Sequence, residues 1–173
     1  MILNLFRKSS VPDAAYAAYR SIVAQSRQER FYAEWGVPDT PTGRFNMITL
    51  HITLLLHRLR SEEGSRAFTQ ALVDLFFQDM DHSHRELGVT DLGVPTKIRR
   101  LGDYFYGLMR ATSEGLDAGT AEALEPVLIK NIYAGNAATG AAPMAAYLLA
   151  ERDRLSREPT AALIAGQVPG LVA

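Results

Sequence analysis

The chain has 173 residues, of which 47% are hydrophobic and 21% charged, with a formal net charge of -1 and no cysteine. This length and composition favour one globular domain with a sizeable core, and the balanced charge excludes a broad positive field for nucleic acid. The absence of cysteine excludes disulfides, thiol catalysis and cysteine-based zinc or iron–sulfur sites.

The N-terminal segment, residues 1–10, has an apolar run too short for a signal peptide, and its charges follow that run. The longest charge-free apolar stretch, 45–57, has 13 residues, fewer than the roughly 20 that a membrane-spanning helix needs. We therefore expect a cytoplasmic protein.

Two helices are predicted before residue 40. The first covers 12–27, because Pro12 and Asp13 are favourable in a first helical turn. The second is a short aromatic helix that ends at Gly36, and a loop rich in proline and threonine follows it.

The third predicted helix is the most apolar of the chain, with Thr42 as its N-cap and an end near Ser61. One face carries Phe45, Ile48, Ile52, Leu55, Leu56 and Leu59, and the opposite face carries Met47, Leu50 and Leu54. A helix that is apolar on both faces is usually surrounded by the others, so we expect this one at the centre.

The remaining helices are predicted at 65–88, 95–115, 120–134 and 141–155. Pro126 should kink the third of these or delay its start. The apolar tail, 161–173, either docks back or frays. No strand pattern or repeat is present, and the sequence predicts an all-α, single-domain bundle of about six or seven helices over 11–160.

Three ionisable side chains continue the apolar stripe of the helix at 65–88. The stripe consists of Phe68, Leu72, Leu75 and Phe76, and at 100° per residue Asp79, His82 and Glu86 continue it. A carboxylate–histidine–carboxylate metal site is one interpretation, which would make the chain a helical metal or small-molecule enzyme. Such bundles need a second Glu-x-x-His set from another helix, and outside the helix at 65–88 the chain offers only His51 and His57, without a matching acid.

The alternative interpretation is a structural polar network in which Asp79, His82 and Glu86 join two helices. Buried carboxylates need partners, and a basic cluster is near in the sequence. That cluster consists of Lys97, Arg99 and Arg100.

The helix at 95–115 has tyrosines beside its core stripe. The stripe consists of Ile98, Leu101, Phe105, Leu108 and Met109. Tyr104 and Tyr106 flank it, with basic residues on both sides. Tyrosines at a core edge often only pack, but a basic face with aromatics also binds apolar or anionic partners. The residues alone leave both interpretations open.

Catalytic motifs are absent: there is no Ser-His-Asp spacing, glycine-rich phosphate loop or H-E-x-x-H. We therefore predict no catalytic residue, no metal and no cofactor. A membrane-peripheral adaptor is a further alternative, with residues 1–8 and the apolar tail as its contacts, although so short an apolar start gives weak insertion.

Residues 41–60 and 68–107 resemble the ubiquinol–cytochrome c chaperone family, which comprises assembly factors of the cytochrome bc1 complex. The matching motifs are F-x-D-M-D at 77–81, R-E-x-G-V-x-D-L-x-V-P at 85–95, a basic run, and F-Y-G at 105–107. A long ordered string of this kind is more specific than a short motif. Thr96 departs from the pattern, because a basic residue is expected there.

The resemblance implies an all-α, non-enzymatic chaperone that binds newly made cytochrome b and promotes assembly of the bc1 complex. It places the chain in a bacterial cytoplasm, peripheral to the inner membrane. Mitochondrial members act with a small partner protein near the ribosome exit, and the sequence leaves open whether this chain does so. The expected client-binding residues are Lys97, Arg99, Arg100, Tyr104 and Tyr106.

Overall fold

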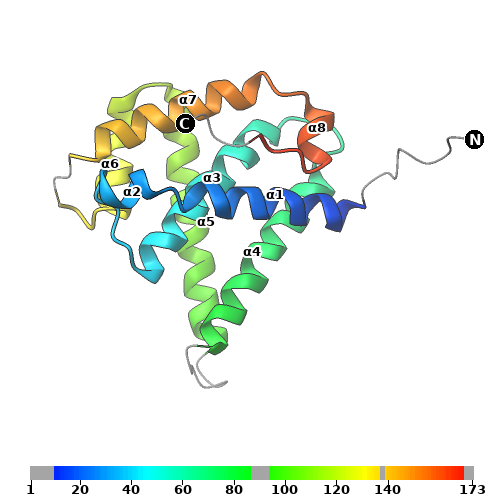
Figure 1. The fold of residues 1–173 in the computed structure, drawn as a ribbon, viewed down its shortest axis with the longest axis horizontal. Helices are drawn as coiled ribbons and strands as arrows, with labels where there is room; N and C mark the ends of the chain where they lie inside the picture. The colour runs from blue at the N-terminus through cyan, green and yellow to red at the C-terminus, as the bar shows by residue number, and fades with distance from the viewer. Residues whose placement is uncertain (1–9, 87–93, 137–138, 170–173) are drawn as a thin grey trace, which may run out of the picture.

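The computed structural model describes residues 10–86, 94–136 and 139–169, without the side chains of 83–86 and 94–98. Regular structure in this part of the chain is α-helical throughout, which confirms the predicted fold class (Figure 1). The longer helices are α1 (Val11–Ser26), α3 (Pro41–Leu59), α4 (Arg66–Glu86), α5 (Val94–Ala118), α6 (Ala121–Asn131) and α7 (Ala141–Ser156). The helices α2 (Glu29–Ala33) and α8 (Thr160–Ile164) have five residues each.

Both early helices with a proline in the first turn begin at a hydroxyl cap. Ser10 Oγ accepts a hydrogen bond from the Asp13 amide at 3.3 Å at the start of α1. The cap of α3 is Thr40, whose Oγ1 accepts from the Gly43 amide at 3.1 Å, so the prediction of Thr42 was wrong by two residues. Pro41 has the backbone angle of a first helical residue and therefore starts the helix earlier.

Helix α3 is the centre of the bundle, as predicted. Residues 45–55 are buried without interruption, and α3 contacts α1, α4, α5 and α7. The polar side chains within this stretch bond to the backbone one turn earlier: Thr49 Oγ1 donates to Phe45 O at 2.9 Å and Thr53 Oγ1 to Thr49 O at 2.7 Å. These bonds satisfy groups that would otherwise be costly to bury.

Helices α4 and α5 extend away from the rest of the molecule and converge at its lower end (Figure 1). The predicted turn between them lies mostly outside the described residues, and Pro95 is in the first turn of α5 as predicted. Helix α6 continues through Pro126, which therefore does not delay its start.

The C-terminal segment docks against α1, one of the two alternatives left open by the sequence. Leu163 of α8 is fully buried. Ser21 Oγ donates to Val168 O at 3.2 Å, and Gln25 Nε2 donates to Pro169 O at 2.8 Å. Gly166, with φ of 83°, fits closely against the Ala14 backbone, where a Cβ would collide. The packed unit therefore extends to residue 169.

Candidate functional site

The part of α5 that projects from the body presents a basic surface with one exposed aromatic ring. We call this surface the α5 face; its residues, all exposed, are Arg99, Arg100, Asp103, Tyr106, Gly107 and Arg110. The opposite side of the helix is buried through Phe105 and Leu108. Tyr106 is 52% exposed, which is unusual for a large aromatic ring.

Tyr106 is held by a cluster of aromatic rings from α4 and α5. The ring centroids of Phe105 and Tyr106 are 5.1 Å apart in an edge-to-face arrangement, and those of Phe77 and Phe105 are 5.3 Å apart. Phe76 completes the cluster at 5.0 Å from Phe105. Edge-to-face pairs of this kind stabilise one orientation of the rings. The exposed ring of Tyr106 therefore packs against a cluster of three phenylalanine rings.

The predicted client-binding residues separate into two groups. Arg99, Arg100 and Tyr106 lie together on the exposed side of α5. Tyr104 is half-buried, and its hydroxyl donates to Asn131 O at 3.1 Å, which ties α5 to the end of α6. Burial raises the pKa of Tyr104. The Lys97 side chain lies outside the described residues, and client contact by each of these residues stays a prediction.

Asp103 and Gly107 also lie on this surface and were not predicted as part of a site. Projection of α5 at 100° per residue places both on the arc that holds Arg99 and Arg110. A Cβ added to Gly107 would meet nothing within 4 Å, so the fold itself does not require glycine there. The absence of a side chain leaves the helix backbone open to a close approach by another molecule.

Asp79 joins α4 to α1. Its Oδ2 accepts a hydrogen bond from the Tyr19 hydroxyl at 2.7 Å, and among the described residues its partner is this tyrosine, not Arg99 or Arg100. Burial and the neighbouring carboxylate raise the pKa of Tyr19. Tyr19 and Asp79 are 60 positions apart, and so distant a pair leaves no local signal. The sequence therefore did not indicate Tyr19 as the partner of Asp79.

His82 is exposed, so the expectation that it continues the buried stripe was wrong. The side chain of Glu86 lies outside the described residues, and the network of Asp79, His82 and Glu86 stays a prediction. Within the described part of the chain, no three histidine or carboxylate side chains converge on a common point for a metal.

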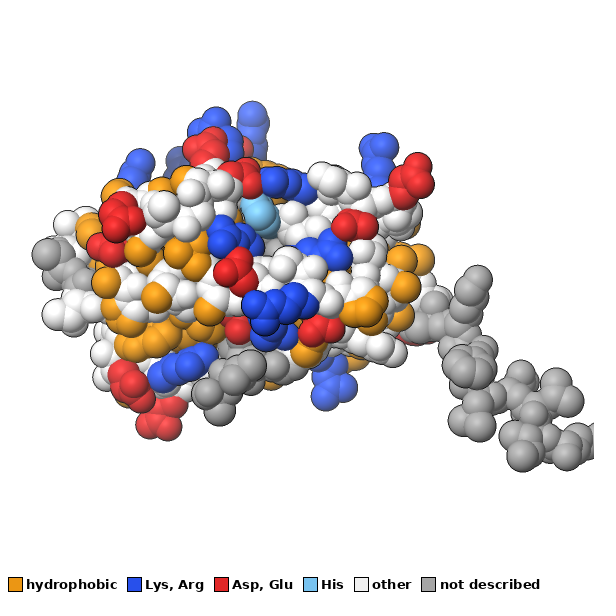
Figure 2. Space-filling view, turned by 90° about the horizontal axis from the view of Figure 1, so that it is seen from above, with side chains coloured by type: hydrophobic (Ala, Val, Ile, Leu, Met, Phe, Trp, Pro, Cys, Tyr) orange, Lys and Arg blue, Asp and Glu red, His pale blue; other side chains and the backbone are white. Residues whose placement is uncertain are grey.

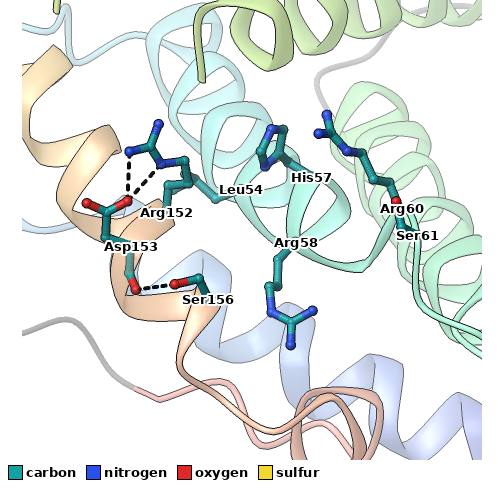
Figure 3. A pocket seen from close by; sticks show the side chains of 8 residues that line it. All are labelled: Leu54, His57, Arg58, Arg60, Ser61, Arg152, Asp153 and Ser156. Carbon is teal, nitrogen blue, oxygen red and sulfur yellow. Dashed lines mark hydrogen bonds and ion pairs between the residues drawn. The ribbon is translucent and has the colours of Figure 1, made fainter. Parts of the chain in front are cut away.

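A cavity of about 310 Å³ lies beside the end of α3 (Figure 3). Arginines dominate its wall, and each of them joins helices. Arg58 Nε donates to Leu155 O at 3.0 Å, and Arg152 Nη1 donates to Leu116 O at 2.7 Å. Arg60 is paired with Asp117, which also bonds to His57, and these contacts hold the pKa of that carboxyl well below its usual range. The cations here have partners already, so this cavity is structural.

No helix in the described residues is both long enough and apolar enough to cross a bilayer. The α5 face is the best candidate for a functional surface in this part of the chain, because it is exposed and basic and carries an aromatic ring that the fold leaves uncovered.

Comparisons with known proteins agree with this architecture. The crystal structure of the Cbp3 homolog from Brucella abortus is 43% identical, covers 99% of this chain and 97% of that chain, and has a TM-score of 0.87. Ubiquinol-cytochrome c reductase complex assembly factor 1 of Homo sapiens is 26% identical over 123 residues, 69% of this chain and 41% of the human protein. The Xenopus laevis protein is 20% identical over 112 residues, 64% of this chain and 56% of its own length.

This chain therefore spans about two fifths of the human relative and just over half of the Xenopus one. A family model described as Ubiquinol-cytochrome C chaperone matches residues 33–171, most of the chain. The chain belongs to the ubiquinol–cytochrome c chaperone family.

Proposed function

We propose that this protein is an assembly chaperone of ubiquinol–cytochrome c reductase that binds newly made cytochrome b and has no catalytic activity. Family membership and the assembly factors among its relatives support the class of function. The observation that carries the site is the α5 face, where Tyr106 stands exposed among arginines.

The α5 face suits a membrane-protein client before its insertion into the complex. A nascent membrane protein presents apolar segments next to polar ends, and an exposed aromatic ring contributes much to such contacts. Arginines bind carboxylates and the carbonyl ends of helices, and they also contact anionic lipid headgroups. Gly107 allows a client helix to approach the α5 backbone closely.

The same chemistry fits a working position in the cytoplasm beside the inner membrane. Arg99, Arg100 and Arg110 would contact the anionic surface from which the client is folding. A small partner protein or the ribosome exit region would bind elsewhere on the molecule. Nucleic acid is not proposed as a partner, because the net charge is -1.

The test is the amount of assembled bc1 complex in membranes of a strain that lacks this gene, measured by haem b and haem c difference spectra. We expect a selective loss that the wild-type gene restores. Normal levels of the complex in the deletion strain would contradict the proposed function.

The site is tested in the same strain with Arg99→Glu, Arg100→Glu and Tyr106→Ala combined, which should fail to restore the complex. The matched control combines Tyr16→Ala and Arg20→Glu on α1 with Arg27→Glu at its C-cap; Tyr16 is 55% exposed. The control should restore the complex as the wild type does. Full restoration by the α5 variant, with unchanged thermal unfolding, would remove the α5 face from the proposal but leave the function.

A further inference from the structure

A groove of about 700 Å³ runs along α7. Helix α7 lies at the other end of the molecule from the tip of α4 and α5 (Figure 1). Arg30 and Trp35, in and just after α2, form one wall with Tyr147 of α7, and Arg157 lies beyond the end of α7. Figure 2 looks down on the α7 side: apolar side chains gather toward α2 and α6, and charges of both signs cover the middle. We call this hollow the α7 groove.

Arg30 is the unusual residue of the α7 groove. Its guanidinium lies 5.3 Å from the ring centroid of Phe31, 5.4 Å from that of Trp35 and 5.1 Å from that of Tyr147. Its Nε and Nη2 are buried and have no hydrogen-bond acceptor. Aromatic rings stabilise the positive charge, but they do not replace the acceptor that a guanidinium normally has. No carboxylate of the described residues is paired with Arg30, and because Nε and Nη2 are enclosed, an anion in the groove would reach the guanidinium through Nη1.

The other charges of the groove are balanced within the chain. Glu151 accepts from Arg154 at 2.6 Å, and Asp153 is paired with Arg152 at 2.7 Å. Arg157 is exposed and has no carboxylate partner among the described residues. The uncompensated charge of the groove is thus positive, and it lies at Arg30 and at Arg157.

The wall around Arg30 is fixed by the core. The Met47 carbonyl can only accept, so His51 Nδ1 donates to it at 2.7 Å, and His51 Nε2 accepts from the Tyr147 hydroxyl at 2.8 Å. The backbone of Trp35 is fixed by a hydrogen bond, because its carbonyl accepts from the Tyr133 hydroxyl at 2.9 Å. A site whose walls are already ordered loses little entropy when it binds.

The floor of the groove is made of small residues. Ala146 and Ala150 are one turn apart on α7 and line the groove between its two ends. Small side chains allow the backbone of another helix to come close, and the distance from Pro143 to Arg157 along α7 is about 20 Å at 1.5 Å per residue. The space fits a helix of about four turns better than a small ion.

We propose that the α7 groove binds an acidic helical segment of a partner polypeptide, with one carboxylate on Arg30 and another on Arg157. Charge complementarity argues for this occupant, since Arg30 and Arg157 have no carboxylate partner among the described residues and both acids that line the groove are already paired. The groove is separate from the α5 face, so a partner and a client can bind together. The inference therefore does not depend on the function proposed for the α5 face.

Trp35 allows a direct test, because it is the sole tryptophan of the chain and lies in the groove. The probe is a synthetic alanine- and leucine-based helix of about 15 residues, matched to the length of the groove, with glutamates near both ends. We expect a saturable change of Trp35 fluorescence. The same peptide with glutamine in place of glutamate should bind far more weakly.

The variants Arg30→Gln and Arg157→Gln should each weaken the acidic peptide about ten-fold, because each removes a charge-assisted hydrogen bond. Arg20→Gln, on the exposed surface of α1, is the matched control and should bind as the wild type does. Arg157 is exposed, so its variant keeps the test valid if Arg30→Gln disturbs the packing.

The proposal is overturned by equal binding of the glutamine peptide, by no saturable response, or by unchanged affinity in both variants. Phosphatidylglycerol vesicles and inorganic phosphate are the further probes. A stronger Arg30-dependent response to either of them than to the peptide would show that the groove takes a phosphate group, and would also overturn the proposal.

Discussion

At the scale of single residues, the hydrogen bond between Tyr19 and Asp79 joins α1 to α4 in a partly buried position. Tyr19→Phe leaves the ring in place but removes the donor from the carboxylate. We expect a loss of about 1–2 kcal/mol in the free energy of unfolding, because an unsatisfied partly buried carboxylate is costly. Urea denaturation measures it.

Tyr16→Phe is the control, since Tyr16 is on the same helix and is mostly exposed. It should change the unfolding free energy by less than about 0.5 kcal/mol, as surface substitutions usually do. Equal effects of the two substitutions would mean that the Tyr19–Asp79 bond does not stabilise the fold.

His51 makes the stability of the bundle depend on pH. Burial lowers the pKa of His51 to about 4, against about 6.5 in an unfolded chain. Between these values the unfolded state binds more protons, so stability is complete above about pH 6.5 and falls as the pH drops toward 4. The loss from this group is about 3 kcal/mol at most.

Unfolding free energies measured from pH 7 to 4.5 test this prediction, with His51→Gln as the comparison. The variant has lower stability at pH 7 because the bond to Tyr147 changes, but its curve should be flatter. Parallel curves for the two proteins would show that another group causes the acid sensitivity.

Single residues also show what periodicity can predict. Projection at 100° per residue correctly placed Phe68, Leu72 and Phe76 in the core, and Leu75 of the same stripe is partly buried against it. The same projection failed at His82, because α4 there has left the body of the bundle and, among the described helices, has only α5 beside it (Figure 1). Periodicity gives the direction of a side chain, but it does not say whether a neighbouring element lies there.

At the scale of helices, two glycines of α5 have opposite surroundings. A Cβ at Gly107 would meet nothing within 4 Å, whereas one at Gly115 would lie 2.6 Å from Leu124 Cδ2 of α6. Gly107→Ala should raise the free energy of unfolding by about 0.5–1 kcal/mol, through helix propensity alone. Gly115→Ala should lower it by about 1–3 kcal/mol, because Leu124 is fully buried and has no room to move.

Chemical denaturation of the two single variants measures both changes in the free energy of unfolding. Each variant serves as the control for the other. Stabilisation by Gly115→Ala would mean that α5 and α6 are farther apart than the structure places them. If Gly107→Ala stabilises the protein and yet lowers the level of bc1 complex, the glycine serves the α5 face and not the fold.

The ends of the helices were predictable where the signal is local. Ser10, Thr40 and the prolines after them start helices by satisfying or removing free amides, and the sequence located the first start within one residue and the second within two. Helix α8 was missed because five residues are too few to form a helix alone. It exists through its contacts with α1, which no local pattern encodes.

At the scale of the whole molecule, α3 separates two different surfaces. The α5 face lies toward the tip of α4 and α5, and the α7 groove lies at the other end (Figure 1). The all-α class and the central position of α3 followed from the sequence, since a helix apolar on both sides has to be surrounded. The α7 groove did not, because Arg30, His51 and Tyr147 come together from three helices.

The C-terminal segment packs against α1, so its removal should destabilise the whole bundle. Truncation after Pro159 removes α8 and with it the buried Leu163, the acceptors of Ser21 and Gln25, and the Thr160 hydroxyl that accepts from Arg58 at 3.1 Å. We expect a loss of about 3–5 kcal/mol in the free energy of unfolding, comparable to emptying a large apolar core site.

Chemical denaturation and amide hydrogen exchange measure this loss, and α1 should lose protection before α3 because α8 and the following residues lie against α1. Truncation after Pro169 is the control and should leave the stability nearly unchanged, because it keeps all of these contacts. If both truncated proteins unfold at the same denaturant concentration, the C-terminal segment lies on α1 without stabilising the fold. If only the truncation after Pro159 destabilises the bundle, the segment is part of the folded core.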